Sequence, residues 1–146
     1  MLIRLAKRDD YPQLVDLLHQ LNASDPPAME ATLTAFNTIL DSSQLALLVA
    51  DDNGILVASC YLNIIPNMTR GGRPYAVIEN VVTRKEYRQR GIGKELMNAA
   101  VERAEKAGCY KVMLMTGRKD PAVHAFYKAC GFSGDEKQAY IRRLSP

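Results

Sequence analysis

The segment Tyr87-Arg88-Gln89-Arg90-Gly91-Ile92-Gly93-Lys94 constrains the fold and the function of this chain more than any other. It joins an apolar, strand-like run over residues 76–83 to an amphipathic, helix-like run that starts near Gly91. Glycines let the backbone approach an anion without a side chain in the way. The free N–H groups of a helix's first turn point at such an anion, and the helix dipole adds partial positive charge. The segment therefore predicts a pyrophosphate site on residues 89–94.

Basic residues gather around this segment. Five of them lie between residues 84 and 94, with Glu86 as the one acid among them: Arg84, Lys85, Arg88, Arg90 and Lys94. The whole chain carries a mild net charge of +3. It has no basic stripe with interleaved aromatic residues, so we expect no nucleic-acid partner. The cluster indicates a local anion, and the alternative is a solvated basic turn.

Length and composition predict one globular domain over residues 1–146. No apolar run approaches twenty residues, so we expect no membrane span. The chain has 3 cysteines without metal-ligand spacing and 2 histidines without clustered acids, which indicates no metal site. Apolar surroundings of the cysteines favour buried thiols and a cytoplasmic location.

Apolar periodicity and turn residues predict a mixed α/β order, with a hairpin early and strand–helix–strand late. Asn53-Gly54 is the expected hairpin turn, Gly108 the end of the central helix, and Asp120 the cap of a later helix. The predicted strands cover residues 2–6, 45–51, 55–65, 76–83, 109–115 and 137–144, and helices follow Asp9 or Asp10, Asp25-Pro26, Gly91 and Asp120.

Two familiar phosphate-binding patterns do not fit the glycine segment. A dinucleotide fingerprint needs a third glycine where Leu96 stands, and a nucleotide P-loop needs a four-residue spacer before its Gly-Lys and a Ser or Thr after the lysine. The chain instead resembles the GNAT superfamily of acyl-CoA-dependent N-acetyltransferases. The resemblance rests on Ile78-Glu79-Asn80-Val81-Val82-Thr83, on the glycine segment, and on Phe126-Tyr127-Lys128 with Gly131-Phe132.

That resemblance implies a central mixed sheet whose two parallel strands splay apart around acetyl-CoA. Main-chain groups of Val81, Val82 and Thr83 would bind the acetyl and pantetheine parts, and Tyr127 would face the sulfur. The pyrophosphate would be held by Arg88, Gln89, Arg90, Gly91, Ile92, Gly93 and Lys94. A homodimer is also implied. Thr83 and Lys85 replace the usual valine and proline, which main-chain contacts tolerate, and Asp120 replaces an asparagine whose role is not carried over.

Acetyl transfer to an amine needs a neutral nucleophile. A primary amine with a pKa near 10 is neutral about one time in a thousand at pH 7, a cost of roughly 4 kcal/mol, so a base is useful. Strand alternation places Val77, Glu79 and Val81 on one face, and Ile78, Asn80 and Val82 on the other. Glu79 is thus the candidate base or substrate-orienting residue. The alternative is a structural ion pair with a nearby cation.

Tyr127 is the candidate donor of a hydrogen bond to the leaving thiolate. Transfer of its proton is mildly uphill at equilibrium, by roughly 2 kcal/mol, because a thiol is the better acid. A route through an acyl-cysteine is disfavoured because no histidine adjoins Cys60, Cys109 or Cys130 in the sequence. These residues predict direct attack within a ternary complex.

The acceptor is predicted to be a small-molecule amine. Arg70 and Arg73, in the polar loop over residues 67–74, are candidates for binding an acidic or phosphorylated group of the acceptor, or are merely a solvated hairpin tip. Gly108-Cys109-Tyr110-Lys111 and Tyr140-Ile141-Arg142-Arg143-Leu144 are similar to the glucosamine-6-phosphate N-acetyltransferase branch. Three alternatives stay open: an acetyltransferase of proteins or peptides, a non-catalytic acyl-CoA-binding module, and a binding domain for another nucleotide.

Overall fold

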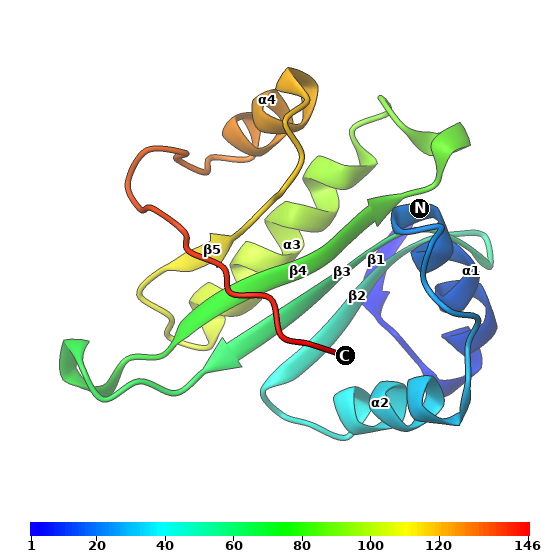
Figure 1. The fold of residues 1–146 in the computed structure, drawn as a ribbon, viewed down its shortest axis with the longest axis horizontal. Helices are drawn as coiled ribbons and strands as arrows, with labels where there is room; N and C mark the ends of the chain where they lie inside the picture. Colours follow the sequence, from blue (N-terminus) through cyan, green and yellow to red (C-terminus); the bar gives the residue numbers. More distant parts are fainter. The chain divides into compact units, whose positions relative to one another are not determined.

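Five strands form one mixed sheet in the order β1-β2-β3-β4-β5. The computed structural model describes residues 1–146, which divide into two compact units, Met1–Leu114 and Met115–Pro146 (Figure 1). The first unit contains β1 (Leu2–Leu5), α1 (Tyr11–Leu21), α2 (Glu30–Leu40), β2 (Leu45–Asp52), β3 (Ile55–Ile65), β4 (Tyr75–Thr83), α3 (Ile92–Lys106) and β5 (Val112–Leu114). The second unit contains α4 (Pro121–Ala129).

Strands β1 to β4 pair antiparallel in chain order, and β5 pairs parallel with β4 after the α3 crossover. The β2–β3 turn confirms the hairpin prediction, since Asn53 (φ 53°) and Gly54 (φ 92°) both take the left-handed conformation that a tight two-residue turn requires. The predicted mixed α/β class is confirmed. None of the helices is long and apolar enough to cross a membrane.

Helices cover both faces of the sheet. Leu14 of α1 and Phe36 of α2 share a buried cluster with Leu47 and Val49 of β2, which defines the α1/α2 face. The side chains of β2 and β3 that point to the opposite face of the sheet pack against α3. The buried stripe of α3 consists of Ile92, Leu96, Met97, Ala100 and Ala104. The helix ends as predicted at Gly108 (φ 79°), where Cys109 N–H donates to the Ala104 carbonyl at 3.0 Å.

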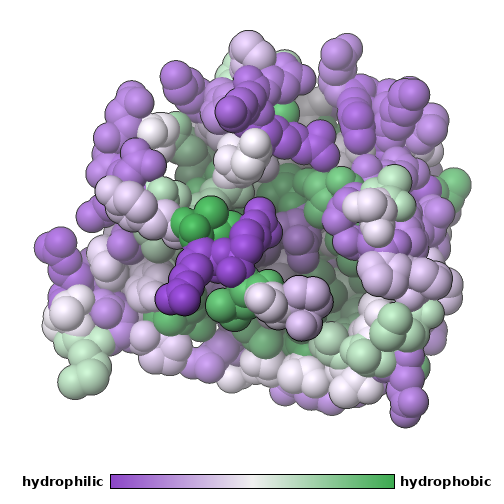
Figure 2. All heavy atoms as spheres, in the orientation of Figure 1, coloured by the Kyte–Doolittle hydropathy of each residue, from purple (hydrophilic) through white to green (hydrophobic).

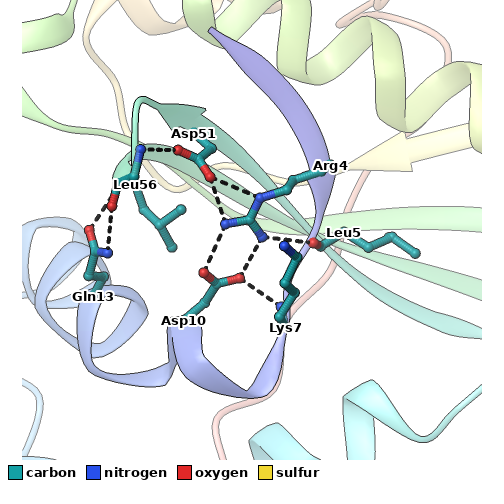
Figure 3. A network of polar contacts seen from close by, with 8 residues as sticks. Arg4, Leu5, Lys7, Asp10, Gln13, Asp51 and Leu56 are labelled. Atoms are coloured by element: carbon teal, nitrogen blue, oxygen red, sulfur yellow. Dashed lines mark hydrogen bonds and ion pairs between the residues drawn. The ribbon is translucent and has the colours of Figure 1, made fainter.

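A polar network fixes the start of α1 to the sheet (Figure 3). The Arg4 guanidinium on β1 donates to Asp10 at 2.7 and 2.9 Å and to Asp51 at 3.0 and 2.8 Å. Asp10 precedes α1, as predicted, but its carboxylate makes no cap hydrogen bond to the helix and accepts instead from Arg4 and from the Lys7 N–H. The network therefore ties the start of α1 to β1 and β2.

Two predicted elements differ from the structure. The helix expected from Asp25-Pro26 begins at Glu30, and residues 22–35 are all exposed, so no apolar contact supports an earlier start. The strand expected over residues 137–144 is not formed. Its apolar side chains Tyr140, Ile141 and Leu144 are 91%, 75% and 86% exposed, and a strand is not stable without hydrogen bonds to a partner strand.

The face shown in Figure 2 exposes both hydrophilic and hydrophobic side chains. Hydrophilic side chains occupy most of the periphery in the space-filling view (Figure 2), as expected for a chain of which 24% of the residues are charged.

Candidate cofactor and acceptor site

The carboxyl end of β4 has one unpaired edge. Parallel pairing joins Ala76, Val77 and Ile78 of β4 to β5, and it stops where β5 ends at Leu114. β4 continues to Thr83 and pairs there with β3 alone. Main-chain groups on the other edge of residues 79–83 therefore have no strand partner. These groups include the predicted acetyl- and pantetheine-binding residues Val81, Val82 and Thr83.

The first turn of α3 presents a second set of free main-chain groups. The first intrahelical hydrogen bond runs from Glu95 N–H to the Gly91 carbonyl at 3.1 Å, and no side chain caps the helix. The N–H groups of Ile92, Gly93 and Lys94 are thus available to an anion. Gly91 takes φ 79°, which glycine adopts without strain, and a Cβ built on it would meet nothing within 4 Å. A phosphate group can therefore approach this backbone closely.

The basic residues around this turn divide into two groups. Arg84 is structural, because its Nη1 pairs with Asp16 of α1 at 2.7 Å and its Nε donates to the Leu56 carbonyl. Arg88 Nε donates to the Thr83 carbonyl at 3.1 Å, and the Arg90 guanidinium lies 5.1 Å from the Tyr87 ring centroid. Lys94 makes no ion pair with any acid. Of the five basic side chains at residues 84–94, Arg84 alone forms an ion pair with an acid, so the other four positive charges are not neutralised by carboxylates of this chain.

Glu79 lies on the α1/α2 face of the sheet, directly opposite Tyr61 of β3. No cation pairs with its carboxylate, so the structure does not support the alternative of a structural ion pair. The predicted alternation along β4 is wrong beyond this residue. Asn80 takes φ 52° at an irregularity in the β3–β4 register, so Glu79 pairs with Tyr61 while Val82 pairs with Ser59. Val82 therefore shares the face of Glu79, because one extra residue reverses the alternation.

Tyr127 lies on α4 in the second unit. Its ring contacts Phe126 at a centroid distance of 5.1 Å and Phe132 at 6.5 Å, so aromatic neighbours restrict its orientation. The predicted cap of α4 is confirmed, since Asp120 Oδ1 accepts from the Ala122 N–H at 2.9 Å. The family role of Tyr127 stays a prediction.

Cys60 and Cys109 lack the surroundings that lower the pKa of a nucleophilic thiol. Cys60 is fully buried, and burial raises its pKa to about 12. Cys109 is also buried, and burial is the main cause that raises its pKa. A thiol that stays protonated at neutral pH is a poor nucleophile, which argues against an acyl-cysteine intermediate at Cys60 or Cys109.

Sequence reasoning missed Tyr61 as a neighbour of Glu79. The residue is half-buried against the α1/α2 cluster, and burial raises its pKa, so its hydroxyl stays protonated at neutral pH. The hairpin turn at Asn53-Gly54 fixes the β2–β3 register, but no local signal in the sequence fixes the register of β3 against β4.

A cavity of about 450 Å³ lies away from these residues, between β1 and the C-terminal half of α3. Its lining includes Leu5, Leu48 and Arg103, and none of the predicted site residues. The candidate site is therefore defined by its free main-chain groups and unpaired side chains rather than by this cavity.

Known proteins share the family pattern and the fold of this chain. The model of the acetyltransferase (GNAT) family matches residues 11–132. Glucosamine 6-phosphate N-acetyltransferase from Trypanosoma brucei brucei is 33% identical over 93% of this chain and 91% of its own length. A solved structure from Agrobacterium tumefaciens, described as a candidate acetyltransferase, has a TM-score of 0.92 and 46% identity over 98% of this chain and 100% of that one.

A more distant structure, an aminoglycoside N-acetyltransferase in complex with CoA, has a TM-score of 0.82 at 23% identity, over 98% of this chain and 94% of that one. It shares the fold. The chain belongs to the acetyltransferase (GNAT) family, a class of acetyl-CoA-dependent acyltransferases.

Proposed function

We propose that this chain transfers an acetyl group from acetyl-CoA to the primary amine of a small molecule, by direct attack within a ternary complex. One observation carries the proposal: the unpaired edge of β4 at residues 79–83 leads into the uncapped first turn of α3. This arrangement supplies consecutive main-chain donors and acceptors to a long, anionic ligand. The relatives of this chain include enzymes that are named for acetylating small amines.

The chain's own residues would bind the donor in two parts. The N–H groups of Ile92, Gly93 and Lys94 bind the diphosphate, with Arg88, Gln89 and Arg90 beside them. The main chain of Val81, Val82 and Thr83 orients the acetyl and pantetheine end. When bound, acetyl-CoA supplies an activated thioester. The fit is supported by the open space above Gly91 and by the absence of carboxylates paired with Arg88, Arg90 and Lys94.

Glu79 and Tyr127 would act as the proton acceptor and the hydrogen-bond donor of the reaction. Glu79 accepts a proton from the acceptor's ammonium group, directly or through water, which offsets the cost of roughly 4 kcal/mol for a neutral amine at pH 7. Tyr127 donates a hydrogen bond to the sulfur as it leaves. The buried Cys60 and Cys109 take no part.

The test is a thiol-release assay with acetyl-CoA across a panel of primary amines, with mass spectrometry of the products. The proposal predicts amine-dependent thiol release, one acetylated amine per thiol, and intersecting rather than parallel lines in initial-rate plots. Thiol release only with peptide amines would favour the alternative of a protein or peptide acetyltransferase. Binding of acetyl-CoA without turnover would favour the alternative of a non-catalytic acyl-CoA-binding module. The homodimer and the cytoplasmic location stay predictions from the sequence.

A further inference from the structure

Two side chains of α1 contact the turn that leads from β4 toward α3. Asp16 Oδ2 pairs with Arg84 Nη1 at 2.7 Å, and Gln20 Oε1 accepts a hydrogen bond from the Lys85 N–H at 3.2 Å. Asp16 and Gln20 are four positions apart on a helix, so they lie on the same side of α1. All four residues belong to the first unit. One side of α1 therefore holds two consecutive residues of the turn.

The contact from Gln20 satisfies a main-chain group that the turn itself leaves free. Lys85 is the first residue of a 3-10 turn, Lys85–Tyr87, and the side chain of the residue before it provides no cap. The N–H of a first helical residue has no partner within its own helix. Gln20 supplies the missing acceptor from another helix, and this hydrogen bond joins the backbone of the turn to α1.

Arg84 connects the same turn to the sheet. Its N–H donates to the Val57 carbonyl at 2.8 Å, and its Nε donates to the Leu56 carbonyl at 2.7 Å. Its own carbonyl accepts from the Tyr87 N–H at 2.9 Å, which closes the turn. The ion pair with Asp16 uses the far end of the guanidinium group. The turn is thus fixed between β3 on one side and α1 on the other.

Residues 88–91 connect this turn to the first turn of α3. Gln89 (φ 60°) and Gly91 (φ 79°) both take the left-handed conformation, which is unfavourable for a residue other than glycine. Such a backbone persists when its surroundings hold it in place. α3 is fixed to the sheet by its own buried stripe. The anchored turn therefore determines where the main-chain amides of residues 88–91 lie relative to those of α3.

We propose that Asp16 and Gln20 are positioning residues for the acetyl donor, because they hold the turn that places the amides of residues 88–91 against the CoA diphosphate. The inference rests on the proposed function, from which it takes CoA as the ligand. The negative charge of Asp16 would by itself repel a diphosphate. A favourable effect of Asp16 on CoA binding therefore has to act through Arg84 and the turn.

The experiment measures, for each variant, the affinity for CoA by calorimetric titration and the free energy of unfolding in urea. Asp16→Ala and Gln20→Ala each remove one contact with the turn. Gln13→Ala, on the same helix, is the matched control. It removes two hydrogen bonds at 2.9 Å, from Gln13 Nε2 to the Gly54 carbonyl and from the Leu56 N–H to Gln13 Oε1. Both of these bonds reach the β2–β3 hairpin rather than the turn after β4.

Asp16→Ala and Gln20→Ala should each weaken CoA binding about fivefold, the loss expected for one hydrogen bond, and Gln13→Ala should bind CoA like wild type. The order of stability should be the reverse. Asp16 and Gln20 are exposed, so their loss should change the free energy of unfolding little, whereas Gln13→Ala leaves the buried Leu56 N–H without its acceptor. In the thiol-release assay the KM for acetyl-CoA should rise by the same factor while kcat changes little.

Two results would overturn the proposal. One is CoA binding by both α1 variants that is as tight as binding by Gln13→Ala. The other is tighter binding by Asp16→Ala, which would mean that Asp16 acts through its charge alone. Binding is measured apart from turnover, so the expected losses of CoA affinity in a protein that releases no thiol would contradict the proposed function alone.

Discussion

Tyr61 and Glu79 face each other across the β3–β4 pair, on the face that α1 and α2 cover in part. Tyr61 packs against the buried cluster of that face, and burial keeps its hydroxyl protonated at neutral pH by raising its pKa. Glu79 has no cation to pair with. The Glu79 carboxylate, which has no cationic partner and lies beside the packed Tyr61 ring, can therefore bind the ammonium group of an acceptor.

Glu79→Gln should lower kcat about 10²-fold or more, the usual contribution of a general base, without changing affinity for CoA. The loss should shrink as the pH rises toward the amine's own pKa near 10, because less deprotonation is then needed. Rates from pH 6 to pH 10 test this, with the exposed Glu86→Gln as control. An unchanged kcat would leave Glu79 without a catalytic role.

Tyr127→Phe should lower kcat about 10-fold or more through loss of the hydrogen bond to the leaving sulfur, while the ring contacts with Phe126 and Phe132 persist. The KM for acetyl-CoA should change little. The matched control is Tyr140→Phe, at a position that is 91% exposed. Equal rates for the two variants would remove Tyr127 from the mechanism.

Gly91→Ala should weaken CoA binding and destabilise the fold by about 1 kcal/mol, because alanine is strained at φ 79°. Gly134→Ala is the control, since Gly134 has neither a positive φ nor a close neighbour. Calorimetry and thermal unfolding measure the two effects. If Gly91→Ala binds CoA like wild type, the backbone at this turn does not set the affinity.

The network of Arg4 with Asp10 and Asp51 should make the free energy of unfolding depend on pH under acidic conditions. The hydrogen bonds from Arg4 are the largest cause that lowers the pKa of Asp10 and of Asp51. Carboxylates with lowered folded-state pKa values contribute stability above their unfolded value near 3.9, and this stability is lost as the pH falls through the folded values. The free energy of unfolding should therefore fall steeply below about pH 4.

Asp10→Asn should cost about 3 kcal/mol at pH 7, because it leaves the largely buried Arg4 with one carboxylate. Its unfolding free energy should also vary less between pH 4 and pH 2. Urea unfolding at several pH values provides the data. Parallel curves for variant and wild type would show that Asp10 titrates no differently in the folded and unfolded chain.

The sequence predicted the elements whose signals are local. The turn at Asn53-Gly54, the glycine end of α3 at Gly108 and the cap of α4 at Asp120 each depend on residues a few positions apart, and all three are confirmed. The mixed α/β class followed from their order.

Features that depend on pairing across the chain were not predicted. Nothing between Ile78 and Val82 signals the irregularity at Asn80, which arises where β4 pairs with β3 and which moves Val82 to the face of Glu79. The alternation over residues 137–144 favours a strand but supplies no partner strand. The ion pair of Arg84 with Asp16 likewise joins residues that only the fold brings together.

The most direct test of the cofactor site is a titration of the ¹⁵N-labelled, 16.2 kDa chain with CoA, followed by NMR of the backbone amides. If the uncapped turn of α3 and the unpaired edge of β4 hold CoA, the largest shifts should fall on the amides of Ile92, Gly93 and Lys94 and of residues 79–83. Saturable binding that leaves these amides unshifted, or no binding at all, would contradict the account.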